Sequence, residues 1–129
     1  MILGLDFDGT CVTHEFPKIG KDIGAIPVLK KIQNRGHRIV LNTIRCDKGP
    51  NEMYLSDAVK WFKDNGIKLF GINRNPIQSN FSTSPKVFAD LYIDDLNLGC
   101  PLRIDKNLSA SPFVDWVEVE KYLKQNNWI

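Results

Sequence analysis

The sequence has few cysteines and no long apolar run. Cys11, Cys46 and Cys100 form no CxxC pair and leave an odd number, so neither a disulfide framework nor a zinc ribbon is predicted. No run approaches the roughly 18 apolar residues of a membrane-spanning helix, and the apolar stretch over 1–5 is too short for a signal peptide. We therefore expect a cytoplasmic protein that starts at Met1 and has no membrane partner.

The chain also lacks a marked excess of charge of either sign. Its 17 basic and 15 acidic side chains leave a net charge of +2, so a nucleic-acid surface is not indicated. The 129 residues are 43% hydrophobic and 25% charged, which is typical of one soluble globular domain. No repeat or linker divides the chain, and we expect a single domain over 1–129.

The apolar pattern predicts alternating strands and helices. Short apolar runs predict strands over 2–5, 38–42, 68–72 and 91–93. Helical spacing and glycine stops predict helices over 26–35, over 51–65 and from about 115. A fifth strand is expected near 102–104 or 113–114, and long loops over 11–24 and 73–85. This order predicts an α/β domain with a mostly parallel sheet covered on both faces.

Acidic side chains follow two of these strands. Asp6 and Asp8 follow the first strand, Thr43 follows the second, and Asp94 and Asp95 follow the fourth. Ligands of open α/β sheets bind at the carboxyl ends of the strands, so these side chains are expected in one pocket. Each pair of carboxylates about 5 Å apart costs on the order of 3 kcal/mol at an effective dielectric near 20. The sequence therefore predicts a cation between them, and oxygen ligands favour Mg²⁺.

Two basic residues are candidates for the same pocket. Lys86 precedes the fourth strand and could supply a fixed positive charge. Arg45 lies two residues after Thr43 and could bind a substrate phosphate or carboxylate with two hydrogen bonds. The alternative for Arg45 is an ion pair at the surface, and the sequence favours neither.

These residues resemble the four motifs of the haloacid dehalogenase (HAD) superfamily of phosphohydrolases. The segment DFDGT over 6–10 is similar to the first motif, Thr43 to the second, Lys86 to the third, and Asp94 with Asp95 to the fourth. The resemblance implies a three-layer Rossmann-like domain with strand order 3-2-1-4-5.

The resemblance also implies a mechanism. Asp6 would be the nucleophile that takes the phosphoryl group, Asp8 the general acid and base, and Thr43 a hydrogen-bond donor to the phosphoryl oxygens. Lys86 would neutralise developing negative charge. Mg²⁺ would be held by Asp6, the main-chain carbonyl of Asp8 and Asp94, with Asp95 acting through water. The remaining substrate-binding candidates are Gly9, Thr10, Asn42 and Arg45.

The segments 11–42 and 44–85 are too short to hold a cap domain as well as the predicted elements. The chain thus resembles a capless member of the superfamily with an open pocket, which a loop or a second subunit of a homo-oligomer could cover. We expect a Mg²⁺-dependent phosphomonoesterase acting on a small molecule or a macromolecule. The alternatives are a phosphate- or metal-binding module without turnover, and a nucleic-acid end phosphatase.

Overall fold

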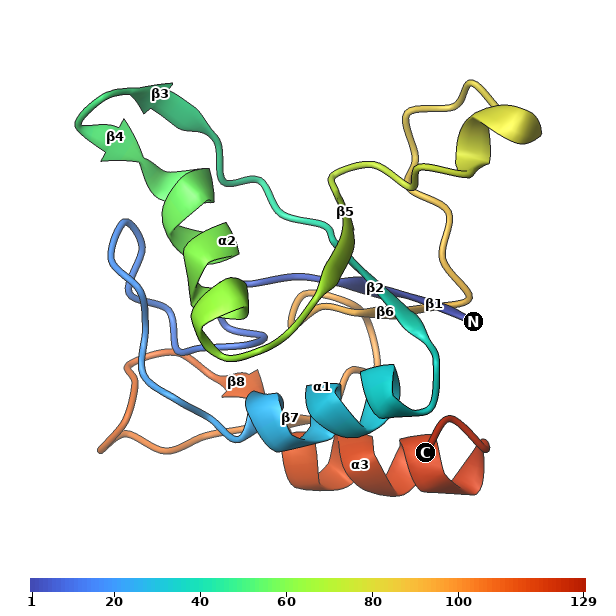
Figure 1. The fold of residues 1–129 in the computed structure, drawn as a ribbon. Helices are drawn as coiled ribbons and strands as arrows, with labels where there is room; N and C mark the ends of the chain where they lie inside the picture. The colour runs from blue at the N-terminus through green and yellow to red at the C-terminus, as the bar shows by residue number, and fades with distance from the viewer.

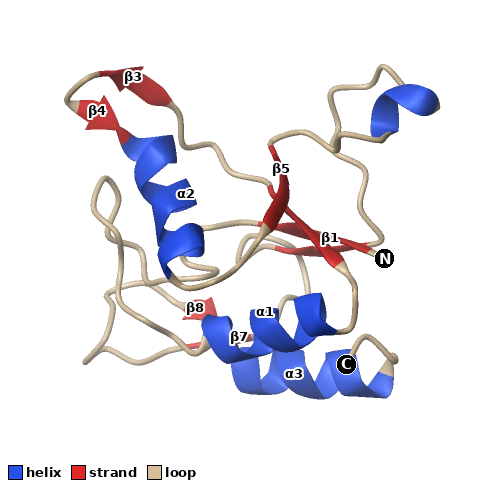
Figure 2. Cartoon of the chain, viewed as in Figure 1, coloured by secondary structure: helices blue, strands red, loops and turns tan.

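The structure is a computed structural model that describes residues 1–129. Figures 1 and 2 show a small parallel sheet, three helices and several long loops. The elements along the chain are β1 (Ile2–Leu5), α1 (Ala25–Asn34), β2 (Arg38–Leu41), β3 (Asp47–Gly49), β4 (Glu52–Met53), α2 (Tyr54–Asp64), β5 (Leu69–Ile72), a 3-10 turn η1 (Gln78–Asn80), β6 (Leu91–Ile93), β7 (Leu102–Arg103), β8 (Phe113–Val114) and α3 (Trp116–Gln125).

The main sheet has the order β5-β2-β1-β6, and all its neighbouring strands are parallel. These are the four strands predicted first, in the order 3-2-1-4. The five-stranded order 3-2-1-4-5 is not confirmed, because β7 and β8 pair with each other in a separate antiparallel sheet. The expected fifth strand is therefore a small hairpin outside the main sheet.

The ends of the helices follow the local sequence signals. Gly36 and Gly66, just beyond α1 and α2, have φ values of 86° and 71°, the left-handed region that glycine adopts without strain. The Asp115 carboxylate accepts hydrogen bonds from Val117 N at 3.1 Å and Glu118 N at 3.2 Å at the start of α3. The helix expected over 51–65 begins later, because the β3–β4 hairpin occupies the segment before Tyr54.

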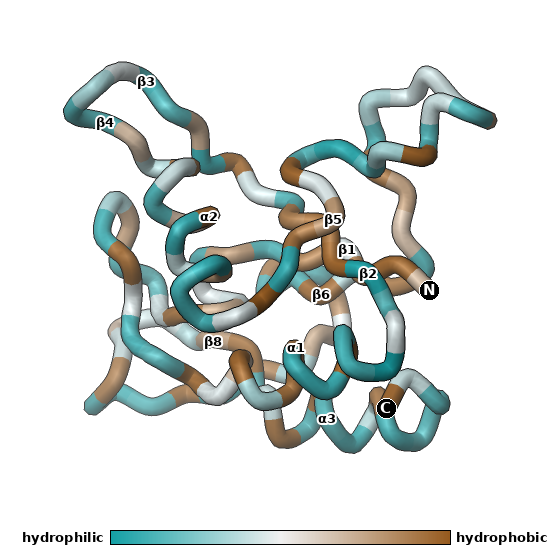
Figure 3. The backbone as a smooth tube through the Cα atoms, viewed as in Figure 1, coloured by the Kyte–Doolittle hydropathy of each residue, from teal (hydrophilic) through white to brown (hydrophobic).

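The two faces of the main sheet are covered differently. Leu3 and Leu5 of β1 join the main core together with side chains from α1, α2 and α3. Ile2 points to the opposite face and joins Val40 and Val87 in a smaller cluster. The three helices therefore pack on one face, and the segment 73–90 covers the other. Figure 3 shows hydrophobic strands at the centre and a hydrophilic β3–β4 hairpin.

The expectation of helices on both faces, in three layers, is thus wrong. The loop expected over 73–85 does form. Side chains make the hydrogen bonds to its backbone that a helix would make within its own backbone. The Gln78 amide donates to Lys86 O at 2.6 Å and accepts from Phe88 N at 2.8 Å, and the Asn75 amide donates to Phe88 O at 3.0 Å. Gln78 and Asn75 are both buried, so they satisfy main-chain groups that water does not reach.

None of the three helices has the length and apolar character needed to cross a membrane.

Candidate active site

The carboxyl ends of β1, β2 and β6 lie side by side in the sheet. Asp6 N donates to Ile93 O at 3.0 Å, and Asn42 N donates to Leu5 O at 2.8 Å. These bonds continue the ladders by one residue beyond each strand. The residues that follow the strands therefore start from fixed backbone positions at one edge.

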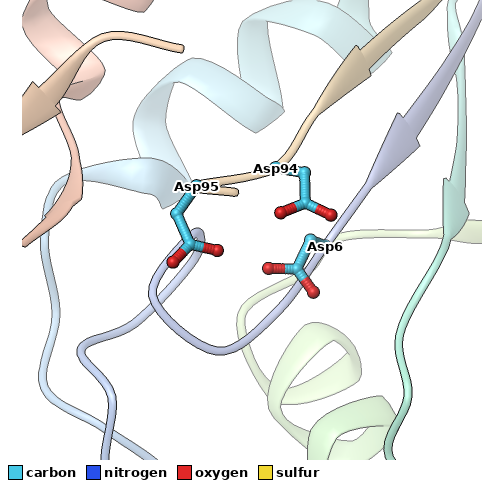
Figure 4. Close-up of side chains that lie close together, drawn as sticks. All are labelled: Asp6, Asp94 and Asp95. Atoms are coloured by element: carbon cyan, nitrogen blue, oxygen red, sulfur yellow. The ribbon is translucent and has the colours of Figure 1, made fainter. Parts of the chain in front are cut away.

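Three carboxylates converge at this edge. One ligand atom from each of Asp6, Asp94 and Asp95 lies within 4.8 Å of the others, and Figure 4 shows the side chains facing one another from β1 and β6. We call this set the acidic group. All three residues are partly buried, and the side chain of Asp95 is only 7% exposed. Three oxygen ligands with access to solvent form a donor set that suits a hard divalent cation.

Burial and like charge act together on Asp6. Burial raises the pKa of Asp6 most strongly, and the negative charges of Asp94 and Asp95 raise it further, to about 7. Hydrogen bonds from Thr10 and the backbone of Phe7 oppose this shift. A carboxylate in these surroundings is short of positive charge, so a cation would stabilise its ionised form. This is an independent physical argument that the acidic group fits a metal ion.

Thr10 orders the acidic group. Its hydroxyl donates to Asp6 Oδ2 at 2.7 Å and accepts from Asp95 N at 3.1 Å. The side chain is buried, so Thr10 supports two carboxylates where the sequence analysis expected it to bind substrate. That expectation is corrected because the hydroxyl has no exposed surface for a ligand.

Gly9 is needed for close packing in the same turn. Its φ is 77°, and a Cβ atom there would lie 2.0 Å from His14 Nε2 and 2.7 Å from Asp95 Oδ2. The Gly9 N–H donates to Val12 O, and its carbonyl accepts from Val114 N. Both main-chain groups are therefore already paired, so Gly9 shapes the turn and offers no free N–H to a substrate.

His14 contacts the acidic group, which the sequence analysis did not predict. Its Nε2 lies 2.8 Å from Asp95 Oδ2, and the ring lines the cavity beside Asp6. The residue comes from the loop over 11–24, where no periodicity or motif signals its direction. Only the close approach permitted by Gly9 brings the ring to Asp95.

Asp8 lines the same cavity but is not part of the acidic group, and its carboxylate pairs with Arg45. Arg45 Nε donates to Asp8 Oδ2, and Nη2 donates to Asp8 Oδ1, each at 2.8 Å. The Arg45 side chain is 0% exposed and the Asp8 side chain 18%. Charge-assisted hydrogen bonds in this bidentate geometry are among the strongest hydrogen bonds in proteins. The positive charge beside Asp8 is thus supplied by Arg45, a residue of the protein itself.

Arg45 has no hydrogen-bond donor left for a substrate. Its other N–H groups donate to the main-chain oxygens of Pro17 at 3.3 Å, Tyr54 at 3.0 Å and Lys18 at 2.8 Å. A guanidinium has five N–H groups, and all five are used. Neither sequence-based expectation for Arg45, a substrate ligand or a surface ion pair, is correct, because two loop carbonyls and the carbonyl of the first residue of α2 enclose the side chain.

Thr43 lies at the edge of the cavity and is fixed through its backbone. Its N–H donates to Asn73 Oδ1 at 2.8 Å, and its hydroxyl accepts from Arg45 N at 3.1 Å. Asn73 follows β5 and has a φ of 50°, a conformation that asparagine tolerates better than most residues. The hydroxyl proton of Thr43 is not used in these bonds. Asn73 is a supporting residue that the sequence analysis missed, although it too follows a strand.

Lys86 lies near the acidic group without pairing to it. A cavity of about 380 Å³ is lined by Lys86, Asp6, Asn42 and Asp94 among others. The Lys86 ammonium lies 5.9 Å from the centre of the Tyr92 ring and forms no ion pair with a carboxylate. The structure thus brings Lys86 to the same cavity as Asp6, and its flexible stem leaves the ammonium free to move.

A second cavity, of about 610 Å³, lies on the other side of Asp6. We call it the main cavity. Its polar lining includes Asp8, Asn42, Thr43 and the acidic group, and its remaining lining includes the following apolar and aromatic residues: Phe16, Ile44, Tyr54 and Leu96. The cavity of about 670 Å³ beside β6 and α3 does not reach the acidic group, so we place the chemistry in the main cavity.

Cys11 takes no part in this arrangement as a nucleophile, whereas Cys46 is exposed in the lining of the main cavity. Cys11 is buried below the turn, where burial raises the pKa of its thiol far above the usual range. Its Sγ contacts Asp6 O at 3.3 Å. A thiol held in its neutral form is a poor nucleophile, which agrees with the sequence analysis, where the cysteines have no assigned role.

The segment from β8 to α3 holds the turn over 6–10 from below. Trp116 Nε1 donates to Thr10 O at 2.7 Å, and Val114 N donates to Gly9 O at 3.0 Å. Both donors lie more than 100 residues further along the chain, and the Trp116 ring is buried. Sequence periodicity placed Trp116 in the core but gave no sign of this hydrogen bond.

Comparisons with known proteins give one strong structural match. No protein-family model and no curated protein matches the chain. The chain is similar to the solved structure of a conserved protein coded by a locus from Bacteroides thetaiotaomicron, with 31% identity and a TM-score of 0.75. The match covers 98% of this chain and 91% of that chain. That protein is described only as conserved, so the chemistry of this site has to be argued from its residues.

Proposed function

The chain belongs to the same family as the conserved Bacteroides thetaiotaomicron protein, and we propose that it is a Mg²⁺-dependent phosphohydrolase that cleaves a phosphomonoester through a phosphorylated Asp6. The observation that carries the proposal is the acidic group. Asp6, Asp94 and Asp95 converge within 4.8 Å in a cavity that also holds Asp8 and Thr43. The resemblance of the same residues to the HAD motifs supports this interpretation.

In the first step, an Asp6 oxygen attacks phosphorus and the bond from phosphorus to the ester oxygen breaks. Asp8 gives its proton to the departing oxygen, so the product alcohol leaves neutral. Arg45 occupies one lone pair on each Asp8 oxygen, and a carboxylate has further lone-pair sites that can carry a proton. Arg45 therefore fixes the direction of Asp8 without blocking it.

In the second step, water attacks the phosphorus of phosphorylated Asp6. Asp8 takes a proton from this water, the bond from phosphorus to the Asp6 oxygen breaks, and inorganic phosphate is released with Asp6 restored. Splitting one displacement into two in this way is the usual gain of a covalent intermediate. The free hydroxyl proton of Thr43 is available to a phosphoryl oxygen at the cavity edge.

Positive charge is needed because phosphoryl transfer depends mainly on electrostatic stabilisation. Asp6, Asp94 and Asp95 would hold the divalent cation, which offsets the charge of the carboxylates and of the phosphoryl group when bound. Lys86 lines the adjoining cavity and would supply a second positive charge by moving its ammonium toward the phosphate.

The test is phosphate release from a panel of phosphomonoesters, with Mg²⁺ and with EDTA. We expect wild-type turnover with Mg²⁺, none with EDTA, and a loss of at least 10³-fold in Asp6→Asn. Asp64→Asn is the matched control, since Asp64 is exposed on α2 and pairs only with Lys60. This variant should keep wild-type turnover.

A second measurement separates an enzyme from a binding module. Beryllofluoride, a mimic of the phosphoryl group, should bind at Asp6 in the presence of Mg²⁺, and Asp6→Asn should not bind it. Binding of the mimic with no turnover of any ester would contradict the phosphatase and favour a phosphate-binding module of the same fold.

A further inference from the structure

We propose that the main cavity takes phosphomonoesters whose alcohol carries a planar aromatic group, and that this group stacks on Phe16. The inference rests on the proposed function and specifies its substrate class. It comes from the wall of the cavity next to Asp8, which the proposed chemistry leaves without a role.

Phe16 lines the main cavity and is held there by two neighbouring side chains. The Arg45 guanidinium lies 5.1 Å from its ring centre, and the Tyr54 ring meets it edge-on at 5.2 Å and 68°. Despite these contacts Phe16 is 56% exposed. Arginine on a ring and edge-to-face aromatic pairs both hold an aromatic side chain in a defined orientation. The exposed part of Phe16 is therefore a fixed platform.

This platform lies beside the group that would protonate the leaving oxygen. Arg45 binds Asp8 through Nε and Nη2 and binds the main-chain oxygen of Pro17, the residue after Phe16, through Nη1. One buried side chain thus ties Asp8 and the Phe16 segment together. Because Asp8 has to reach the ester oxygen, the rest of the alcohol extends from that point toward Phe16.

Two further apolar side chains line the main cavity beside its polar residues. Ile44 is 101% exposed and Leu96 is 87% exposed, and both line the main cavity. Exposed side chains of this size in one pocket are typical of a ligand site. The lining also includes Tyr54 and Lys48, whose side chains end in polar groups. Phe16, Ile44 and Leu96 offer no partner for the hydroxyl groups of a plain sugar phosphate. An aromatic alcohol would cover this surface and gain the stacking contact.

The experiment compares esters that differ in the ring alone. Benzyl phosphate and cyclohexylmethyl phosphate are esters of primary alcohols of similar size, so their chemistry at phosphorus is closely matched. Adenosine 5′-monophosphate and ribose 5-phosphate form a second pair, with and without an aromatic base. Aromatic pairs gain about 0.5–1.5 kcal/mol beyond their buried area. We therefore expect wild-type kcat/KM to be about 3- to 10-fold higher for the aromatic member of each pair.

Variants of Phe16 test whether the ring itself is responsible. In Phe16→Leu, which keeps an apolar side chain, the ratio of kcat/KM within each pair should fall toward 1, and in Phe16→Trp it should be restored. Phe81→Leu is the matched control, since Phe81 is an exposed aromatic residue that pairs with Phe88 outside the main cavity. This control should keep the wild-type ratio.

Each result has a distinct meaning. A wild-type ratio near 1, or a ratio unchanged in Phe16→Leu, with turnover that still needs Mg²⁺ and Asp6, overturns the aromatic site and leaves the phosphatase standing. Absence of turnover of all four esters by the folded protein overturns both. A ratio of 3 or more that depends on an aromatic residue at position 16 supports the inference.

Discussion

Asp8 and Asp6 are two residues apart, yet their carboxylates meet opposite surroundings. Asp8 receives two hydrogen bonds from a buried arginine. Asp6 faces two further carboxylates and receives a neutral hydroxyl from Thr10. The protein supplies its own cation on one side of the turn, and on the other side it gathers negative charge that it does not balance. An uncompensated cluster is costly, so the difference indicates that a cation from solution completes the second side.

The largest effect should come from removing the internal cation. Arg45→Met leaves Asp8 without its partner in a mostly buried setting, and breaking a buried pair from one side costs about 3–5 kcal/mol. The free energy of unfolding, measured by urea denaturation, gives the value. Arg103→Met is the control, since Arg103 pairs with Asp105 at the surface and such pairs contribute about 1 kcal/mol or less. Equal costs for the two variants would contradict the comparison.

A pH series should reveal the uncompensated negative charge of the acidic group. The pKa of Asp6 is raised from 3.8 to about 7, so its stabilising contribution is full below about pH 4 and is lost as the pH rises toward 7. In EDTA, Asp6→Asn should therefore gain stability relative to wild type between pH 4 and 7, by up to about 4 kcal/mol. Saturating Mg²⁺ should shrink this difference. A difference that does not depend on pH would refute the role of charge.

Adding the cation should stabilise the folded protein. At a free Mg²⁺ concentration 100 times Kd, the expected gain is about 3 kcal/mol in the free energy of unfolding. Asp94→Asn should lose most of this gain, whereas Asp64→Asn, on the exposed face of α2, should keep it. Thermal unfolding with and without Mg²⁺ measures both. An equal gain in both variants would mean that the ion binds elsewhere.

The smallest expected effect is on Mg²⁺ affinity, from removal of the side chain that contacts Asp95. His14→Gln removes the ring that contacts Asp95 Oδ2, and loss of such a supporting contact typically weakens metal binding about 10-fold or more. Isothermal titration with Mg²⁺ measures the affinity. The control is His37→Gln, because His37 contacts the main chain of Met1 and Trp128 and lines neither cavity beside the acidic group. The idea fails if both variants bind Mg²⁺ equally well.

The sequence was sufficient for the four strands of the main sheet and for the acidic group, but not for the β3–β4 hairpin. Apolar runs at 2–5 and 91–93 predicted β1 and β6, and the rule that ligands gather at the carboxyl ends of strands placed Asp6, Asp94 and Asp95 together. Both inferences use only local pattern and parallel topology, so they do not depend on how any side chain packs.

The surroundings of Arg45 and His14 could not be predicted in the same way. Three of the five donors of Arg45 are bound by main-chain oxygens of Pro17, Lys18 and Tyr54, and any residue type provides such an oxygen. His14 reaches Asp95 through a loop without periodicity. Contacts made by backbone atoms of irregular segments leave no signature in residue type or spacing.

For a related reason, the sequence did not predict that an irregular segment covers the second face of the sheet. Parallel sheets usually carry helices on both faces. This rule assumes that the chain crossing each face is helical, so that its buried main-chain N–H and C=O groups are hydrogen-bonded within the helix. In this chain the buried amides of Gln78 and Asn75 satisfy that backbone, so an irregular segment is stable there. The polar composition of 73–85 predicted the loop but not its role as a layer.

The hydrogen bond from Trp116 to the Thr10 carbonyl has a consequence for how the protein is made. The turn over 6–10 leaves the ribosome before the indole that holds it and before Val114 N, which both lie more than 100 residues later in the chain. Asp94 and Asp95 also appear late. The nascent chain therefore carries an unfinished turn while these later residues are made, and the acidic group becomes complete only after Asp94 and Asp95 have been added.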